Sequence, residues 1–562
     1  MFRRSGRLRL IAAVTAATLI GSVVAGVSAG AASASGLART GWQATGTQSL
    51  TSVLAGATSL GSADRSTPLR IDVVLEARNS SKLSSIARAA SNPSSPEFGK
   101  FLTPAAYLSE FAPTASSVSA VSNYLTNEGF KTLSVDANRL MVTATGTVAE
   151  AEKAFHTTID GFDLGGHTVY ANISAAYVPV SLSSTVGAVL GLSDIPMNSI
   201  EPSIKTPLTG YYPKEFQKVY GATGTPTGSQ TSIAVMAEGD LTSVIKDLRL
   251  AEKEQKLPVV PVTVVPTGPA SSDTSGADEW DLDTQVSTGM AETVKRLYIY
   301  DASDLTDTDI AHEINVWSAQ DKAQLGSASL GEPDVLAFLD GSMLAIDQSV
   351  EEAAAQGQSF FASTGDTGAS CAIEDTNGVP DSGLTASLCY PADGTWTTAV
   401  GGTTLITDSN DTYVDELAWN AGGGGQSYLE YPGAWTDIAD PTASEGFRGD
   451  PDIAMDADLT TGADIYVGKS PETIGGTSVS SPLAMGAVAR VESALHNKLG
   501  IAVERFYGLY NAANPATGDT NPVPGFHDII AGTNGLYAAT PGWDFTTGIG
   551  SLDVAPLIQA LR

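Results

Sequence analysis

From Thr231 onward, short apolar runs alternate with helical segments, and no other feature of the chain restricts its fold as much. Helical patterning covers 340–355 and 481–494, among other segments. The strand-like runs are IAVMA, VKRLYIY, SFFAST and TTAVGG. This alternation predicts an α/β domain with a mainly parallel sheet. Glycine-rich turns follow the runs, at the sheet edge where such domains place their functional sites.

The chain before Thr231 has a different pattern. Residues 35–66 are rich in Ser, Thr, Gly and Ala and predict a loose lead-in. The next segments predict a compact α+β module over about 67–180, and a Pro- and Ser-containing stretch, 196–213, separates it from the α/β domain. Its expected strands are 69–76, 130–134 and 139–145, and its expected helices are 82–90, 116–128 and 147–155.

The N-terminus has the features of an export signal. Four arginines within residues 3–9 precede an apolar stretch, 10–27, and the small residues ASA at 32–34 fit a cleavage site. We therefore expect a signal peptide over 1–34 and a secreted, extracellular protein. An uncleaved anchor is the alternative, since the apolar stretch is nearly long enough to span a membrane. The paired arginines at 3 and 4 are compatible with twin-arginine export, although the rest of that motif is poor.

The composition limits the classes of molecule that this protein is expected to bind. Of 562 residues, 42% are hydrophobic, and 62 acidic against 30 basic residues give a formal charge of -32. An acidic surface argues against nucleic acid and anionic membranes as partners. The acidic surface keeps the protein soluble, or it makes the protein tolerant of acid. When its carboxylates are protonated, a protein with few basic groups gains little net positive charge and repels itself less.

The chain has two cysteines, Cys371 and Cys389. A disulfide is plausible in an oxidising compartment, and two free buried thiols are the alternative.

The segment from Gly475 to Pro482, GGTSVSSP, leads from a small-residue turn into an apolar helix. Ser478 at such a helix start would be exposed beside outward-pointing N–H groups, which suits a nucleophile next to an oxyanion site. A plain serine or threonine helix cap explains the same residues.

A nucleophilic serine needs a base, and two carboxylates are candidates. Glu279 and Asp283 are four residues apart in DEWDLDTQ and share one face of a helix. Two carboxyls held together cannot both ionise easily, so such a pair can accept a serine proton at acid pH. Asp278 and Asp281 are competitors on other faces.

Asp366 lies in the glycine-flanked turn STGDTGA that follows a strand-like run. An aspartate in this position is a turn former, or a carboxylic acid that donates a hydrogen bond to an oxyanion.

The five histidines are poor candidates for the base. His312-Glu313 begins like a zinc-binding H-E-x-x-H, but residue 316 is Val. None lies in the glycine-flanked setting of a subtilisin histidine, and a structural or surface role is expected for His156, His167, His312, His496 and His527.

Together these segments resemble the sedolisins, a family of serine-carboxyl peptidases with a subtilisin-like fold and a Glu-Asp-Ser triad. The family's S-G-T-S-x-x-x-P segment matches here with Gly475 in place of its first serine. Its E-x-x-x-D pair matches at 279 and 283. Its S-S-G-D-x-G-A segment matches at 363–369, with Thr364 in place of the second serine.

The resemblance implies a role for each matching residue. Ser478 would be the nucleophile, Glu279 its general base, Asp283 the carboxyl partner of Glu279, and Asp366 the oxyanion-hole acid. Activity would then peak in acid, at about pH 3–5, because the carboxyl pair must keep one proton.

A calcium site is implied near the C-terminus, where HDII and TPGWDFTTGIG resemble the family's single structural Ca²⁺ site. The carboxylates of Asp528 and Asp544 and the backbone oxygens of Ile529, Thr540 and Gly542 would bind the ion. Relatives often have glycine where Thr540 stands.

The N-terminal module resembles the family's activation domain, of the pro-kumamolisin type, through SSPEFGKFLTP and NRLMVTATGTVAEAEKAF. Residues 35–205 would be a propeptide that inhibits its own enzyme, 206–562 the peptidase domain, and 201–211 the region cleaved. Protein or peptide substrates are expected. We expect a monomer without nucleic acid or stable membrane association after signal removal.

Four other functions stay open at this point. They are a tripeptidyl-peptidase of the same family, a non-catalytic secreted binding protein on the same scaffold, a histidine-dependent subtilisin, and a lipase or esterase. The last is disfavoured because the catalytic domain has no G-x-S-x-G. Leu330-Gly331 stands where relatives often have Trp-Gly, which would alter a substrate subsite.

Overall fold

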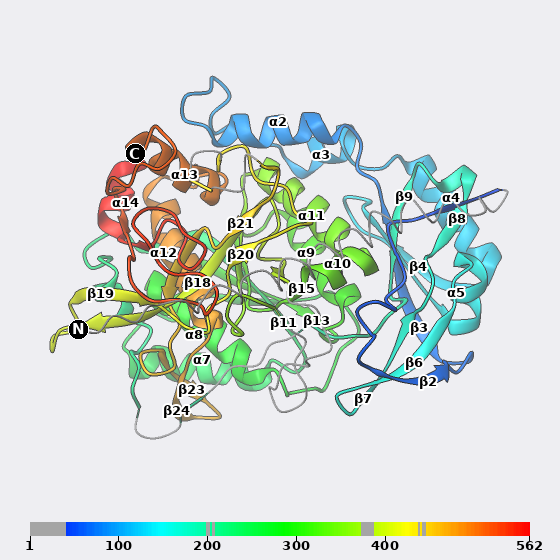
Figure 1. Ribbon diagram of the computed structural model, residues 1–562, viewed down its shortest axis with the longest axis horizontal. Helices are drawn as coiled ribbons and strands as arrows, with labels where there is room; N and C mark the ends of the chain where they lie inside the picture. Colours follow the sequence, from blue (N-terminus) through cyan, green and yellow to red (C-terminus); the bar gives the residue numbers. More distant parts are fainter. Residues whose placement is uncertain (1–40, 198–202, 205–207, 372–386, 437–438, 441–444) are drawn as a thin grey trace, which may run out of the picture. The chain divides into compact units, whose positions relative to one another are not determined.

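The computed structural model describes residues 41–197, 203–204, 208–371, 387–436, 439–440 and 445–562 (Figure 1). The predicted signal peptide lies outside these residues, as does part of the predicted cleavage region. The chain divides into residues 1–43 and a compact unit, 44–562, to which everything below refers. Among the described helices, none is both long and apolar enough to span a bilayer.

A largely parallel sheet organises the C-terminal part of the unit, here called the α/β domain (residues 208–562). Its strand order is β12-β13-β11-β14-β16-β18-β19, with β22 also paired to β18. All pairs are parallel except β18 with β19. The strands are β11 (Gly228–Glu238), β12 (Val262–Pro266), β13 (Val294–Ala302), β14 (Leu325–Ala328), β16 (Ser359–Ser363), β18 (Thr397–Thr407), β19 (Tyr413–Ala418) and β22 (Ile453–Asp456). The predicted α/β fold with a mainly parallel sheet is confirmed.

Buried helices pack against this sheet. Helix α12 contacts β11, β18 and β22, and every residue from Thr477 to Ser493 is buried, as expected for a helix without a polar face. The main helices are α7 (Thr242–Glu254), α8 (Ala277–Ala291), α9 (Asp307–Gln320), α10 (Asp334–Asp340), α11 (Ser342–Gln356), α12 (Thr477–Ala494), α13 (Ala502–Ala513) and α14 (Val554–Ala560).

The N-terminal module (residues 44–197) is built on an antiparallel sheet of order β4-β5-β3-β9. Its strands are β3 (Pro68–Leu75), β4 (Lys131–Val135), β5 (Met141–Thr147) and β9 (Val186–Leu190). A second sheet joins β2 (Thr58–Ser62), β6 (Ile159–Leu164) and β7 (His167–Asn172). The helices are α2 (Ser80–Ser91), α3 (Pro104–Glu110), α4 (Ala115–Glu128) and α5 (Val148–Phe155).

The module is larger than its sequence pattern predicts. Strand β9 lies beyond residue 180 yet pairs with β3, so the sheet needs it. The expected loose lead-in also contributes to the core: Leu50, Val53 and Leu54 are buried in one cluster with Leu339 of α10. Tertiary contacts order this segment although its composition lacks a periodic pattern.

The N-terminal module packs on helices of the α/β domain. Helix α2 and strand β9 contact α11, and Figure 1 shows α2 next to α11. Arg70 of β3 forms an ion pair with Asp309 of α9 and contacts His312 of the same helix. The His312 Nε2 atom lies 3.1 Å from an Asp136 carboxylate oxygen. The buried contact is therefore polar as well as apolar.

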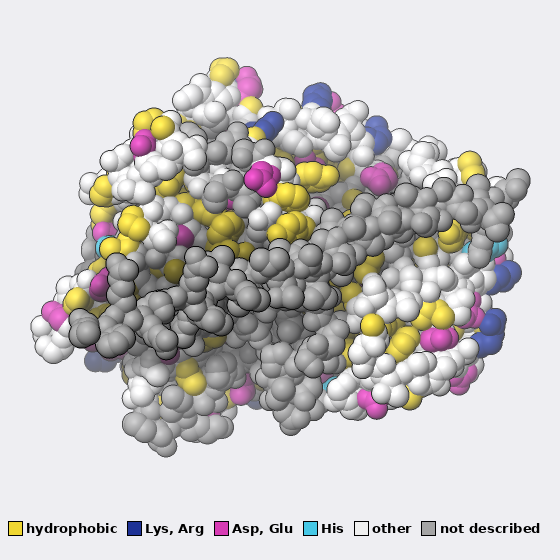
Figure 2. Space-filling view, in the orientation of Figure 1, with side chains coloured by type: hydrophobic (Ala, Val, Ile, Leu, Met, Phe, Trp, Pro, Cys, Tyr) yellow, Lys and Arg dark blue, Asp and Glu magenta, His cyan; other side chains and the backbone are white. Residues whose placement is uncertain are grey.

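The visible surface agrees with the acidic composition. In Figure 2, acidic side chains are spread singly among uncharged ones, and over the described part of this face the basic side chains form no broad patch.

One glycine at the module contact is expected to be sensitive to substitution. Gly341 joins α10 to α11 with φ 95°, and an added β-carbon would lie 2.6 Å from the Ala188 β-carbon. Because φ is positive and space is lacking, we expect Gly341→Ala to lower the free energy of unfolding by about 2 kcal/mol. Chemical denaturation of the full chain measures this change.

Gly508→Ala is the matched control. Gly508 lies within α13, where an added β-carbon meets nothing within 4 Å. It should be neutral or stabilise the chain by up to about 1 kcal/mol. Equal effects of the two substitutions would contradict the analysis of Gly341.

Candidate active site

The predicted site residues come from elements that meet around the start of α12. Helices α8 and α12 pack closely because α12 has a glycine at the contact: an added β-carbon at Gly486 would lie 2.5 Å from the Ser287 backbone oxygen. Strands β14 and β16 also contact α12. The segments that carry the predicted carboxylates and the predicted nucleophile therefore converge.

Ser478 is the second residue of α12 and is only 6% exposed. The expectation of an exposed serine is therefore wrong, because Ser329 and Asp366 lie against the start of the helix. The helix begins at Thr477, earlier than the apolar pattern from 481 predicts, after Gly476 with φ 106°. First-turn N–H groups of a helix lack intrahelical acceptors. The plain capping role is not supported, since the residue before the helix, Gly476, has no side chain to cap it.

Both predicted carboxylates of α8 are buried. Glu279 and Asp283 are 1% and 0% exposed. The Ser329 hydroxyl donates a 2.7 Å hydrogen bond to Asp283 Oδ1 and also lies 3.4 Å from the Ser478 backbone oxygen. Burial raises the pKa of Asp283 well above its ordinary value, although the Ser329 bond opposes the rise. Neither carboxylate oxygen of Glu279 has a hydrogen-bond partner among the described residues.

Asp366 lies beside the residue that precedes Ser478. Its Oδ1 atom accepts hydrogen bonds from the backbone N–H of Thr477 at 2.7 Å and from the Thr477 hydroxyl at 2.8 Å. Burial raises the pKa of Asp366 to about 6, although both Thr477 bonds oppose the rise. The group is therefore a neutral acid at acid pH.

Two polar residues of this cluster were not singled out from the sequence. Ser329 bridges Asp283 and the Ser478 backbone, and Thr477 holds Asp366. Their only sequence signal is position: Ser329 follows strand β14 directly, and Thr477 is the first residue of α12. A hydroxyl at a strand end is too common for this signal to identify a site.

The competing acids and histidines have other surroundings. Burial raises the pKa of Asp281 to about 9, with the nearby Asp247 as the second cause, so it belongs to the face of α8 that meets α7. His312 contacts the N-terminal module through Asp136. His527 stacks on Tyr413 with ring centroids 3.8 Å apart. None of these contacts involves Ser478.

The two cysteines form a disulfide between residues 371 and 389. Cys389 lies against two glycines of the predicted site: added β-carbons at Gly331 and Gly365 would lie 3.2 and 2.6 Å from its side chain. Gly365 directly precedes Asp366. The disulfide thus borders the turn that carries the predicted oxyanion acid.

The predicted calcium ligands lie on two loops that contact each other. The Asp528 carboxylate accepts from the Gly542 N–H at 3.1 Å, and Asp544 accepts from the Thr540 N–H at 2.8 Å. The backbone oxygens of Ile529, Thr540 and Gly542 accept no hydrogen bond within the described part of the chain. Two close carboxylates and free carbonyl oxygens fit a hard cation such as Ca²⁺.

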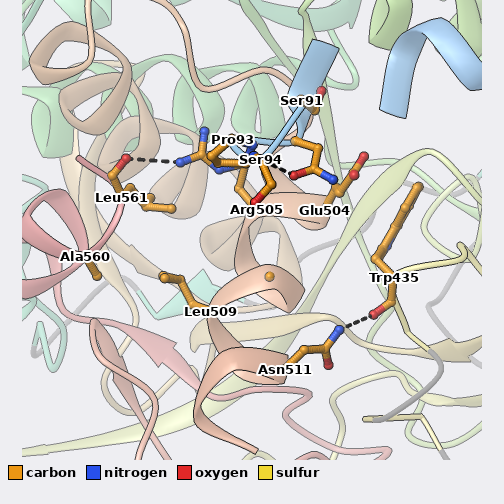
Figure 3. Close-up of a pocket in the computed structure, with 12 residues that line it drawn as sticks. Ser91, Pro93, Ser94, Trp435, Glu504, Arg505, Leu509, Asn511, Ala560 and Leu561 are labelled. Carbon is orange, nitrogen blue, oxygen red and sulfur yellow. Dashed lines mark hydrogen bonds between the residues drawn. The ribbon is translucent and has the colours of Figure 1, made fainter. Parts of the chain in front are cut away.

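Two cavities beside α13 are separate from this site. Figure 3 shows one of about 310 Å³, lined by the loop after α2 and by α13, where Arg505 donates to the Leu561 backbone oxygen at 3.0 Å. None of the predicted catalytic residues lines it. Its position therefore does not bear on catalysis.

Comparison with known proteins decides the family. Residues 55–195 match the family described as pro-kumamolisin, activation domain, and residues 270–526 match the subtilase family. Sedolisin of Pseudomonas sp. (strain 101) is 36% identical over 524 residues, covering 88% of this chain and 87% of that protein. The chain belongs to the sedolisin family.

Other relatives agree with membership of the sedolisin family. Xanthomonalisin of Xanthomonas sp. (strain T-22) is 32% identical over 550 residues, covering 87% of this chain and 65% of that protein. The solved structure of Pseudomonas sedolisin, a serine-carboxyl proteinase complexed with two molecules of pseudo-iodotyrostatin, is 34% identical. It superposes with a TM-score of 0.57 over 63% of this chain and 99% of that chain.

The predicted family, fold class and enzyme class are thus confirmed. The protein is a sedolisin-type serine endopeptidase, with an activation domain ahead of a subtilase-like domain. An activation domain implies that the enzyme is made as a zymogen.

The pKa of Asp366 predicts how stability changes with pH. Because its pKa rises from 3.8 to about 6 on folding, the folded chain holds this proton more tightly. The resulting stability is complete below about pH 3.8 and is lost as pH rises through about 6. Between about pH 4 and 7 the parent should lose roughly 2 kcal/mol of unfolding free energy through this group, and Asp366→Asn should abolish that part of the loss.

Denaturant unfolding at several pH values measures this, with Ser478, the predicted nucleophile, replaced by Ala in every protein to guard against self-cleavage. Glu254→Gln, at an exposed ion pair with Lys253, is the control and should leave the pH profile unchanged. Parallel profiles for Asp366→Asn and its parent would show that the pKa of Asp366 does not rise on folding.

Proposed function

We propose that this sedolisin is a secreted, acid-acting endopeptidase made as a self-processing zymogen, with Ser478, Glu279 and Asp283 as its triad and Asp366 as its oxyanion acid. The observation that carries the proposal is the polar link across the helix contact. Ser329 joins buried Asp283 to the Ser478 backbone, while Asp366 accepts from Thr477. A helix-start serine between protonatable carboxyls matches the chemistry required.

In the first step, Glu279 removes the hydroxyl proton of Ser478 as its oxygen bonds to the carbonyl carbon of the substrate peptide. Protonated Asp366 and the Ser478 N–H donate hydrogen bonds to the oxygen that becomes negative. Glu279 then returns the proton to the leaving amine as the C–N bond breaks. Water repeats the sequence on the acyl-enzyme, releasing the acid and restoring the Ser478 hydroxyl.

Acid pH suits these groups better than neutral pH. Burial raises the pKa of Asp283 and of Asp366, so both hold protons under conditions where exposed carboxylates ionise. Protonated Asp366 donates a hydrogen bond, which its carboxylate could not do. Protonated Asp283 lets Glu279 ionise without a second buried negative charge four residues away.

Self-processing is supported by the position of the linker. We assign residues 35–205 to the propeptide and 206–562 to the peptidase domain, after a signal peptide over 1–34. Strand β10 (Ser203–Ile204), within the predicted cleavage region, pairs with the end of β24 (Ser470–Ile474). Strand β24 leads directly into the turn before Ser478, so this stretch of linker lies close to the proposed nucleophile.

We further propose one structural Ca²⁺, bound by the carboxylates of Asp528 and Asp544 and by backbone oxygens of Ile529, Thr540 and Gly542. The ion would hold the two C-terminal loops together.

We also propose that the enzyme is a monomer that acts on protein or peptide substrates. The propeptide would be its intramolecular inhibitor.

Acidification of the purified precursor to about pH 4 tests the catalytic residues. We expect the wild type to lose roughly 19 kDa, the mass of about 170 residues at ~110 Da each, and then to degrade denatured protein. Ser478→Ala should remain intact, and Glu279→Gln should lose at least about 10³-fold in rate. Electrophoresis over time and release of peptides follow both processes.

Asp281→Asn is the matched control for the carboxylates of α8. Asp281 is buried on the same helix, and its pKa of about 9 means that it is already neutral at pH 4. It should process like the wild type. An active Glu279→Gln protein that becomes inactive when a histidine is replaced would point instead to a histidine-dependent subtilisin.

Loss of a calcium ligand should be detected as loss of a bound ion. Asp544→Asn is expected to bind one calcium ion fewer per chain and to unfold at a lower temperature in calcium-containing buffer. Elemental analysis after gel filtration and calorimetry measure the two effects. Asp519→Asn, on a neighbouring loop outside the predicted ligand set, should keep the ion; the same ion count in Asp544→Asn would refute this assignment.

A further inference from the structure

Three acidic residues that the proposed mechanism does not use converge beneath the N-terminal module. Asp307 begins α9, Glu332 lies in β15 (Glu332–Pro333), and Asp340 ends α10. Each is at least nine-tenths buried, at 5%, 1% and 6% exposure. One carboxylate oxygen from each lies within 4.8 Å of the others.

Internal donors satisfy only part of this cluster. Ser342 donates its backbone N–H to Asp340 at 2.8 Å and its hydroxyl to Glu332 at 3.1 Å. Asp307 Oδ1 and Glu332 Oε2 have no partner among the described residues. No lysine, arginine or histidine of the described chain forms an ion pair with the three carboxylates. Buried carboxylates without a counter-charge are costly.

An independent observation comes from the N-terminal module. Asn172, at the end of β7, is fully buried, and its Nδ2 atom donates to the backbone oxygens of Gln48 at 2.5 Å and Ser174 at 3.0 Å. These two bonds fix which end of the amide is oxygen. Asn172 Oδ1 is buried with no donor in the described structure. The residue lines the same cavity as Asp307 and Asp340.

The cavity and its oxygens have the dimensions of a small cation site. Its volume is about 10 Å³, near the minimum for one water-sized particle. Ca²⁺ binds oxygen at roughly 2.3–2.6 Å, so oxygens on opposite sides of the ion lie up to about 5 Å apart. Mg²⁺, at about 2.0–2.1 Å, needs a tighter set. Oxygen-only ligands also disfavour zinc and copper.

We propose that Asp307, Glu332 and Asp340 of the α/β domain, with Asn172 Oδ1 of the N-terminal module, form a Ca²⁺ site between the two parts of the zymogen. It is separate from the site at Asp528 and Asp544, with which it shares no residue. The ion neutralises the buried carboxylates and ties the end of β7 to the turn that follows α10. Propeptide release removes one ligand and a wall of the cavity, so the site belongs to the precursor.

Calcium titration of the full-length precursor tests the proposal. The protein carries Ser478→Ala, is freed of metal with a chelator, and is titrated with CaCl₂ at about pH 7.5, where carboxylates are ionised. Isothermal calorimetry should detect a binding event that Asp340→Asn weakens at least tenfold and that Asp544→Asn leaves intact. Asn172→Ala should weaken the same event about three- to tenfold, because it removes one of four protein ligands.

Glu351→Gln is the control for loss of charge at this contact. Glu351 lies on α11 and accepts from Ser84 of the N-terminal module, outside the cluster. It should leave calcium binding unchanged. Equal calcium affinity in Asp340→Asn and its parent would overturn the proposal and mean that the three carboxyls share protons instead.

A crystal-soaking experiment needs no substitution in the cluster, so it tests the proposal even if a cluster variant does not fold. Crystals of the precursor soaked in a lanthanide salt should give an anomalous peak between Asp307, Glu332 and Asp340, and an empty position there would also overturn the proposal. Neither experiment measures peptide hydrolysis. The calcium result therefore stands or falls independently of the roles proposed for Ser478 and Glu279.

Discussion

The close approach of α8 to α12 is the contact on which the candidate site depends. Gly486 allows it, since any side chain there would meet the Ser287 backbone. Both helices are buried along almost their whole length, so neither can shift without opening the core. Carboxyls on one helix and a serine at the start of the other are thereby held in fixed relation. Ser329, from the end of β14, joins the two at the centre.

Many carboxyl groups are buried in this structure. Their raised pKa values affect both the stability of the fold and the chemistry proposed for the site. A carboxyl that is buried without a cation prefers its proton, so its pKa rises. This holds at the candidate site for Asp283 and Asp366, and at the domain contact for Glu352, whose pKa burial raises to about 8. Folding therefore takes up protons, and the folded chain gains stability as pH falls toward the acid range. The acidity that the proposed chemistry requires is also the condition that these groups prefer.

The N-terminal module packs directly against the α/β domain through buried contacts. Leu50 packs with Leu339 across the contact, and Arg70 pairs with Asp309. Asn172 faces the buried acids Asp307 and Asp340. Removal of the module would expose apolar surface and several titratable groups of α9, α10 and α11 together. Maturation of the zymogen is thus a change in the burial of charge as well as the opening of a site.

The sequence alone was sufficient for the parallel sheet, the helix carrying Glu279 and Asp283, and the motif around Ser478, because each depends on local periodicity or on a short run of small residues. Three features depended on tertiary contacts. Strand β9 and the segment around Leu50 lack a distinctive local pattern and are ordered only by what they pack against. Ser329 is an ordinary hydroxyl until the packing of α8, α12 and β14 places it between Asp283 and Ser478. Burial depends on the surrounding chain and cannot be read from spacing along the sequence. The same holds for two consequences of burial and packing: the raised pKa of Asp366 and the grouping of Asp307, Glu332 and Asp340.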